Sequence, residues 1–248
     1  MLCLKFQLIN QLKIQDQFFL HQELFFCINL FFCINVVRRR VCKTRGRDIR
    51  KNYVNLLNNV SNKHGDIFYD SVLKFYKEIS DPDTSVSLKF PNNEEFLENF
   101  NFFDVYSDDI SKHILRRFEN NIRNPEDALK DNDWEIEHVM PLSATRVKDW
   151  KPYLGNSQKE RKENHATYKN TIGNLTILKA KPNKTVSNKY FTEKKRIEKY
   201  GYKNSPFLLT QEVYRYEGDW DIEKIKRRCE DFSKKILKIW PSPFSPNF

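Results

Sequence analysis

The sequence predicts an α+β chain that is mostly helical, with a small unit of two strands and one helix embedded in helices. Apolar residues recur at three- and four-residue spacing along much of the chain, which is the period of amphipathic helices. Two short strand-like runs stand apart from that pattern, at 134–141 and 175–178. A helical pattern follows the second run, so strand, long loop, strand and helix succeed one another across 134–200.

The helices expected around this unit are defined by their apolar stripes and by the residues that break them. Helical segments are predicted at 44–80, 92–106, 111–121 and 221–239. The last segment has a stripe typical of a core-facing helix, formed by Ile222, Ile225, Cys229, Phe232, Ile236 and Ile239. Within the unit, the basic segment 142–172 is expected to be a loop, and Ser187 is expected to cap the final helix.

Composition divides the chain into five parts. An apolar N-terminal segment, read as a helix or a truncated remnant, precedes a helical region, a two-strand core with its basic loop, a C-terminal helical cover and a proline-rich tail expected to be disordered. These parts are 1–43, 44–130, 131–203, 204–241 and 242–248.

Charge is distributed unevenly along the chain. Residues 66–137 hold 18 acidic and 8 basic residues, whereas 146–203 hold 16 basic and 5 acidic ones. A short basic run is usually a solvated surface, but this excess extends over a long segment that also holds the candidate catalytic groups. Such a segment suits a polyanion, because phosphates neutralised by lysine release their condensed counterions. We therefore expect a polyanionic partner such as a nucleic acid, contacted by Lys181, Lys184 and Lys189.

The five cysteines form no recognisable framework. Their number is odd and no CxxC pair is present, which favours reduced thiols in a cytoplasmic protein. The same absence argues against a structural zinc site.

The apolar N-terminal segment contains a repeated hexapeptide. LFFCIN occurs at 24–29 and again at 30–35, and the mainly apolar run extends from 24 to 37. A membrane span needs roughly 20 apolar residues, so this run is too short for one. A signal peptide carries its positive charges before the apolar run, whereas Arg38, Arg39 and Arg40 follow it here. A helix that packs on another domain or a partner subunit is the expectation.

Three residue types suited to phosphodiester hydrolysis occur in and after the two strand-like runs. Glu137 and His138 lie in the first run, and Asn183 follows the second. Neutral imidazole suits a general base near neutral pH. A single Mg²⁺ or Mn²⁺ ion is the expected cofactor, since hard cations accept one carboxylate and one carboxamide and retain water.

The motifs around these residues resemble the HNH (His-Me finger) nuclease module, also called ββα-metal. The strings are EHVMP at 137–141, GNLTIL at 173–178 and NKTVSNKYFTEK at 183–194. More narrowly, they are similar to the C-terminal domain of GmrSD-type modification-dependent restriction endonucleases. The nine-residue step from Asn174 to Asn183 matches the step between the second and third signature residues of HNH nucleases. The similarity covers about 90–241.

The resemblance implies a role for each matching residue. His138 would be the general base, and Glu137 and Asn183 would hold the metal. Asn174 would brace the loop and orient His138. Asn188 and Lys194 would contact phosphate.

The resemblance also implies a metal-dependent DNA endonuclease that serves in restriction and phage defence. The larger family enzymes carry an N-terminal domain similar to ParB-like nucleotide hydrolases, for which residues 1–90 have no room. The chain has only six glycines and no Gly-rich phosphate loop. The expectation is either a separate nucleotide-hydrolysing subunit or a truncated remnant of a two-domain enzyme. A catalytically inactive nucleic-acid-binding module is the alternative.

Overall fold

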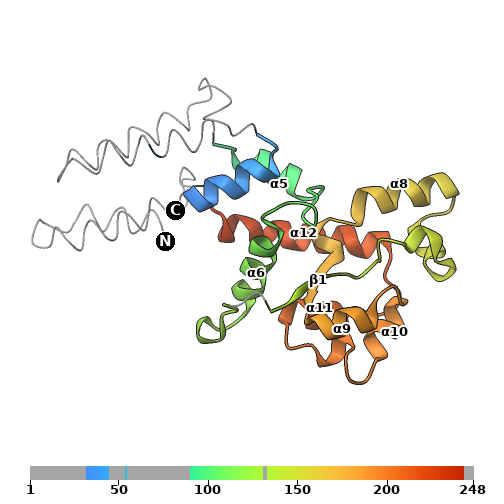
Figure 1. The fold of residues 1–248 in the computed structure, drawn as a ribbon. Coiled ribbons are helices and arrows are strands. Elements are labelled where there is room, and N and C mark those ends of the chain that lie inside the picture. The colour runs from blue at the N-terminus through green and yellow to red at the C-terminus, as the bar shows by residue number, and fades with distance from the viewer. Residues whose placement is uncertain (1–31, 45–53, 55–89, 131–132, 243–248) are drawn as a thin grey trace, which may run out of the picture. The chain divides into compact units, whose positions relative to one another are not determined.

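The computed structural model describes residues 32–44, 54, 90–130 and 133–242 (Figure 1). The chain separates into two compact units, one made of 1–99 with 240–248 and the other of 100–239. Nearly all of the helix predicted at 44–80 lies outside the described residues, as do most of the N-terminal segment and the tail from 243. None of the helices described is both long and apolar enough to cross a membrane.

The first unit is held together by a buried arginine. Arg38 lies on a helix that covers 32–41, and its guanidinium donates to Pro91 O at 3.1 Å, Trp240 O at 2.9 Å and Asn93 Oδ1 at 2.8 Å. These partners come from the segment before α5 (Asn93–Phe100), from α5 itself and from the C-terminal end of the described chain. Arg38 therefore ties its own helix to residues 91–93 and to Trp240, which are far apart in sequence. Burial lowers the pKa of Arg38 to about 10.

The second unit contains the predicted two-strand sheet. Strands β1 (Glu135–His138) and β2 (Leu175–Leu178) pair antiparallel, with Glu135 opposite Leu178 and His138 opposite Leu175. The α+β, mostly helical class is thus confirmed. β2 is buried at every residue, as expected of a strand packed on both faces.

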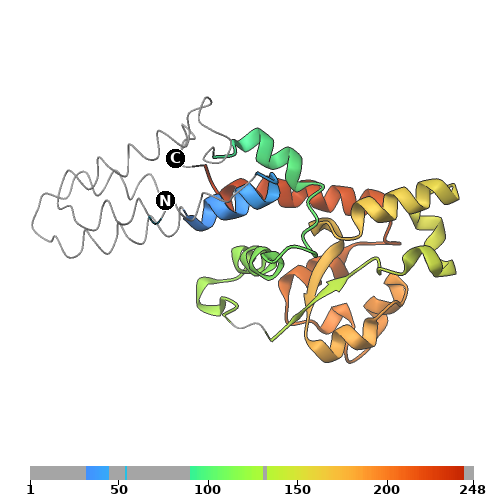
Figure 2. The ribbon, with the colours of Figure 1, turned by 45° about the horizontal axis from the view of Figure 1, so that its top comes forward.

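Helices surround this sheet on several sides (Figures 1 and 2). Helix α9 (Ala180–Val186) packs against β1, α11 (Leu208–Arg215) packs against β2, and α12 (Ile222–Ile239) packs against the turn that precedes β2. The six apolar residues predicted for the stripe of α12 are all buried.

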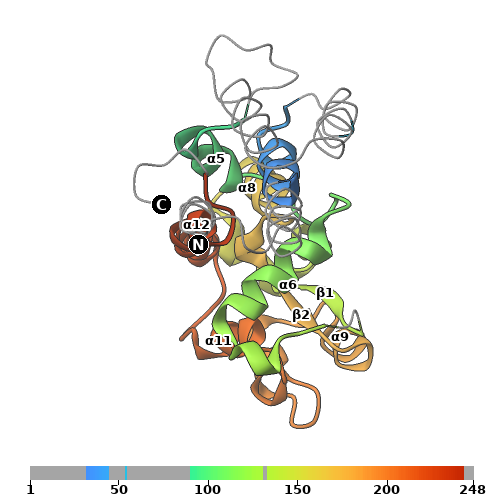
Figure 3. The same cartoon turned by 90° about the vertical axis from the view of Figure 1, so that its left-hand side faces the viewer.

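Helix α6 (Ser111–Ile122) also follows its predicted position and meets α12 (Figure 3). Phe118 of α6 and Phe232 of α12 pack edge to face, with ring centroids 4.6 Å apart. This aromatic contact joins helices from opposite ends of the unit and buries both side chains.

The prediction of a loop at 142–172 was wrong. This segment contains α7 (Lys151–Leu154) and the eleven-residue α8 (Gln158–Tyr168). His165 is the one buried residue of α8, so this helix has no apolar stripe from which it could be predicted. Its start is instead fixed by capping: Ser157 Oγ accepts from Glu160 N at 3.1 Å, and Glu160 Oε2 accepts from Asn156 N at 2.8 Å.

The role predicted for Ser187 was also wrong. Ser187 ends α9 instead of starting a helix, because its backbone turns to a φ of 40° and its N–H donates to Asn183 O at 3.0 Å. Pro182 lies in the first turn of α9, where a missing N–H breaks no helical bond. The following helix, α10 (Phe191–Arg196), is therefore separate and short.

Candidate functional site

His138 is the last residue of β1 and is 8% exposed. Its Nε2 lies 3.1 Å from Asn170 Oδ1. The ring of Tyr106, which is 40% exposed, meets the imidazole edge to face at 4.3 Å between centroids. His138 is thus held between a carboxamide and an aromatic ring near the surface.

Burial controls the charge of this histidine. Burial lowers the pKa of His138 to about 4, and the hydrogen bond to Asn170 opposes that shift. Lys194 and His165 lower the pKa further by their positive charge, whereas Asp104 raises it. The imidazole is therefore neutral at neutral pH, as a proton acceptor must be.

Asn170 is itself fixed by a second pair of hydrogen bonds. Its Nδ2 donates to Asp104 Oδ2 at 3.0 Å and to Ser107 Oγ at 3.3 Å. Partial burial acts to raise the pKa of Asp104, but the hydrogen bonds from Asn170 and Ser107 outweigh it, so the pKa lies below its usual value. Neither Asp104 nor Asn170 belongs to the three motif strings, and no local sequence pattern predicted their contact.

Glu137 lies next to His138 in sequence but takes part in a different cluster. Side chains alternate along a strand, so Glu137 and His138 project to opposite faces of β1. Glu137 Oε1 accepts from Lys194 Nζ at 2.6 Å and from Tyr202 Oη at 2.7 Å. Lys194 Nζ also donates to His138 O at 2.8 Å. This buried cluster ties α10 to the end of β1.

Burial dominates the pKa values of the cluster. Burial raises the pKa of Glu137, and the charge and hydrogen bond of Lys194 oppose that shift. Burial likewise lowers the pKa of Lys194 and raises that of Tyr202. The side chain of Lys194 is 0% exposed, so this geometry does not support the phosphate contact predicted for it.

Asn183 lies on α9 and contacts the outer part of β1. Its Nδ2 donates to Glu135 Oε2 at 2.9 Å and to Ile136 O at 3.4 Å. Glu135 and Glu137 share one face of the strand, because they are two positions apart. The structure thus brings Asn183 to the carboxylate of Glu135. The sequence motifs did not single out Glu135. Its position two residues before Glu137 nevertheless indicates that both carboxylates lie on the same face of β1.

These oxygen-bearing groups have the chemistry of a hard-cation site. A carboxylate and a carboxamide suit Mg²⁺ or Mn²⁺, and Asn183 Oδ1 has no hydrogen-bond partner among the described residues. Rotating the carboxamide by half a turn would direct that oxygen at Glu135, since amide N and O are assigned from the hydrogen-bond network. No group of three His, Cys, Asp or Glu residues that could hold a metal is found in the described part of the chain.

Asn174 and His165 both support the segment after β1. Asn174 is fully buried: its Oδ1 accepts from Met140 N at 2.8 Å, and its Nδ2 donates to Met140 O and Lys169 O, each at 2.8 Å. His165 Nε2 lies 3.1 Å from Pro141 O, and the side chain is buried. The carboxamide that is hydrogen-bonded to the His138 ring is therefore that of Asn170, not that of Asn174.

The remaining predicted DNA contacts are on the surface. Lys181 and Lys184 are exposed on α9, and Asn188 and Lys189 are exposed in the turn after it. Lys181 Nζ lies 5.3 Å from the centroid of the Tyr200 ring. These side chains are available to solvent close in sequence to Asn183.

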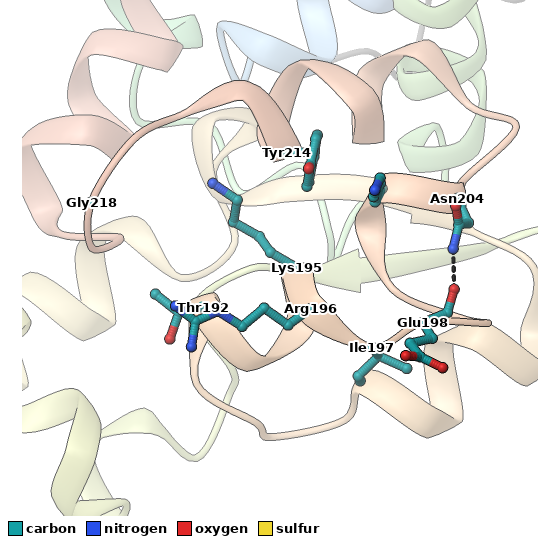
Figure 4. A pocket seen from close by; sticks show the side chains of 9 residues that line it. Thr192, Lys195, Arg196, Ile197, Glu198, Asn204, Tyr214 and Gly218 are labelled. Carbon is teal, nitrogen blue, oxygen red and sulfur yellow. Dashed lines mark hydrogen bonds between the residues drawn. The ribbon is translucent and has the colours of Figure 1, made fainter.

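A pocket of about 670 Å³ lies beside α10. Figure 4 shows Thr192, Lys195 and Arg196 projecting from α10, and Asn204 donating to the backbone of Glu198. None of His138, Glu135 or Asn183 lines it. The pocket is therefore not the place of the candidate chemistry.

The fold and the site together define a mostly helical α+β domain with a neutral histidine at the end of a two-strand sheet. The family model of the GmrSD restriction endonucleases, C-terminal domain, matches residues 90–235. The chain belongs to this family, which confirms the resemblance to the GmrSD-type C-terminal domain and places the chain among nucleases of the restriction-endonuclease type. No curated protein and no solved structure matches the chain.

Proposed function

We propose that this chain is a metal-dependent DNA endonuclease of the HNH (His-Me finger) type, with His138 as its general base. The observation that carries the proposal is the buried, neutral imidazole of His138, hydrogen-bonded on one nitrogen and placed at the end of β1. Family membership supports nuclease chemistry, and the exposed lysines near Asn183 supply a surface for a phosphate backbone.

The chain's own residues divide the work. His138 accepts the proton of the attacking water. Asn183 and a carboxylate of β1 would hold one Mg²⁺ or Mn²⁺ ion, and contact with Asn183 favours Glu135 over Glu137. When bound, this ion supplies charge stabilisation at the phosphoryl oxygens and the leaving oxygen. Asn188, Lys184 and Lys189 position the DNA backbone.

One observation favours a second function. Strand alternation places His138 and the Glu135–Asn183 pair on different faces of β1. A phosphodiester could then contact both groups only by reaching around the end or an edge of this strand. A module that binds DNA without cutting it is the alternative favoured by this separation.

Plasmid cleavage separates the two functions. Supercoiled DNA incubated with the full chain and Mg²⁺ is expected to become nicked and linear, and a chelator is expected to prevent this. His138→Ala should abolish cleavage while DNA affinity stays the same, and His113→Ala, a change on α6, is the matched control. DNA binding with no metal-dependent cleavage by the parent chain would establish the binding module instead.

A further inference from the structure

The segment 104–107, which lies outside the motif strings, contacts the candidate base directly through the Tyr106 ring and indirectly through Asn170. Asp104 and Ser107 follow α5, and their side chains bond Asn170, which in turn bonds His138. We propose that Asp104 and Asn170 hold His138 in the tautomer protonated at Nε2, which leaves Nδ1 as the nitrogen that accepts the proton. The assignment of Nδ1 as base rests on the proposed function, whereas the tautomer does not.

The direction of each hydrogen bond follows from the chemistry of the partners. An ionised carboxylate can only accept, so Asp104 Oδ2 requires the amide nitrogen of Asn170 to face it at 3.0 Å. Ser107 Oγ donates to the same Oδ2 at 3.1 Å and is left to accept from Asn170 Nδ2. With its nitrogen committed, Asn170 presents Oδ1 to His138, and an oxygen acceptor requires an N–H at Nε2.

Main-chain hydrogen bonds also hold Asn170 against the segment 104–107. The N–H groups of Val105 and Tyr106 donate to Asn170 O at 3.0 and 3.3 Å, and Ser107 N donates to Asp104 Oδ1 at 2.9 Å. Val105 is fully buried, so the loop is anchored by its core side chain as well. Asp104 and Asn170 are 66 residues apart in sequence, and Asn170 is joined to the segment 104–107 by side-chain bonds to Asp104 and Ser107 and by main-chain bonds from Val105 and Tyr106.

The tautomer matters because a neutral imidazole has one donor and one acceptor nitrogen. The other tautomer would direct an N–H at the water that is to be deprotonated, and that histidine could not act as base. Asp104 and Asn170 are positioning residues in this scheme, since they act through His138. A correctly placed general base contributes about 10²–10⁴-fold to a rate, so loss of tautomer control is expected to lower kcat by at least about tenfold.

The tautomer can be measured directly on the full chain. Long-range ¹H–¹⁵N correlation spectra of ¹⁵N-histidine-labelled protein at neutral pH distinguish the two ring nitrogens, and His138→Ala assigns the signal. The parent chain is expected to show the Nε2–H form alone. Asn170→Ala is expected to give a mixture of tautomers, with a lower kcat for plasmid cleavage and an unchanged DNA affinity.

Exchanging Asp104 and Asn170 with each other distinguishes a loss of tautomer control from a general loss of folding. Asn170→Asp alone places two carboxylates together and is expected to disturb the site. Asp104→Asn combined with Asn170→Asp restores a donor facing an acceptor, and should recover the Nε2–H tautomer together with most of kcat. Asn164→Ala is the control, since Asn164 donates to Leu154 O at 2.8 Å and has no bond to His138.

The outcomes are distinct. An Nδ1–H form in the parent, or an unchanged tautomer and kcat in both Asn170→Ala and Asp104→Ala, would overturn the inference. If the parent does not cut DNA but the tautomer changes as described, tautomer control is supported and the proposed endonuclease function fails.

Discussion

Lys194 and Glu137 form an ion pair inside the fold, with Nζ and Oε1 2.6 Å apart and side chains 0% and 5% exposed. The same ammonium donates to the carbonyl of His138. A residue of α10 therefore neutralises the carboxylate next to the candidate base and fixes the backbone of the base itself. The family motifs predict that Glu137 binds the metal and that Lys194 contacts phosphate. In the structure, the two side chains instead pair with each other and support β1.

Lys194→Met should destabilise the protein strongly. Removing one partner of a buried ion pair leaves the other charge uncompensated, at a cost of about 3–5 kcal/mol. The free energy of unfolding from urea titration measures the effect. Lys234→Met is the control, because Lys234 pairs with Asp231 at the surface and such pairs contribute about 0–1 kcal/mol. A change at Lys194 no larger than that at Lys234 would contradict the assigned burial.

Glu135→Gln should weaken metal binding without a large loss of stability. Glu135 contacts Asn183 and is only half-buried, whereas Glu137 is buried in the cluster with Lys194. We expect the affinity for Mn²⁺, measured by calorimetry, to fall about tenfold or more in Glu135→Gln, the lower limit seen even for outer-shell partners. Glu137→Gln should mainly lower the free energy of unfolding. The reverse pattern would return the ligand role to Glu137.

Elements with a regular apolar pattern were predictable from the sequence. The stripe of α12 and the apolar residues of α6 are read from spacing alone, because core-facing residues recur with the helical period. The run 175–178 was predictable as a strand because it is short and mainly apolar, as is typical of a strand buried on both faces. Helix α8 was not predicted, because it is stabilised by capping and polar contacts and not by an apolar stripe. The three-residue spacing of Ser157 and Glu160 is nevertheless a sequence signal for the start of a helix.

The site was predictable only in part, since its supporting contacts are long-range. His138, Asn174 and Asn183 stand out through their motifs. Asp104 meets Asn170 across 66 residues of sequence, and no local pattern encodes such a pairing. Strand alternation could have indicated that Glu137 faces away from His138, but not that Lys194 would meet it there.

Asp104 should contribute to stability in a pH-dependent manner. Its pKa in the folded protein lies below 3.8, since the hydrogen bonds from Asn170 and Ser107 outweigh the effect of partial burial. A lowered pKa stabilises the folded state above the unfolded value, and this contribution disappears as pH falls through the folded pKa. The difference in unfolding free energy between the parent and Asp104→Ala should therefore be present at neutral pH and shrink below pH 3.8. A difference that persists unchanged in acid would indicate that the Asp104 charge makes no contribution.

Lys184→Gln and Lys189→Gln should weaken DNA binding through its electrostatic part. Both side chains are exposed on or just after α9, near Asn183. Each phosphate contact that is lost should reduce the slope of log Kd against log salt by about 1, with little dependence on DNA sequence. Fluorescence anisotropy with a labelled duplex over a series of salt concentrations measures the slope. Lys159→Gln is the matched control, since Lys159 is exposed on α8 beside Glu163 at 3.9 Å. If all three variants reduce the slope equally, the binding surface is not confined to α9 and its turn, and the lysines near Asn183 have no special part in holding DNA.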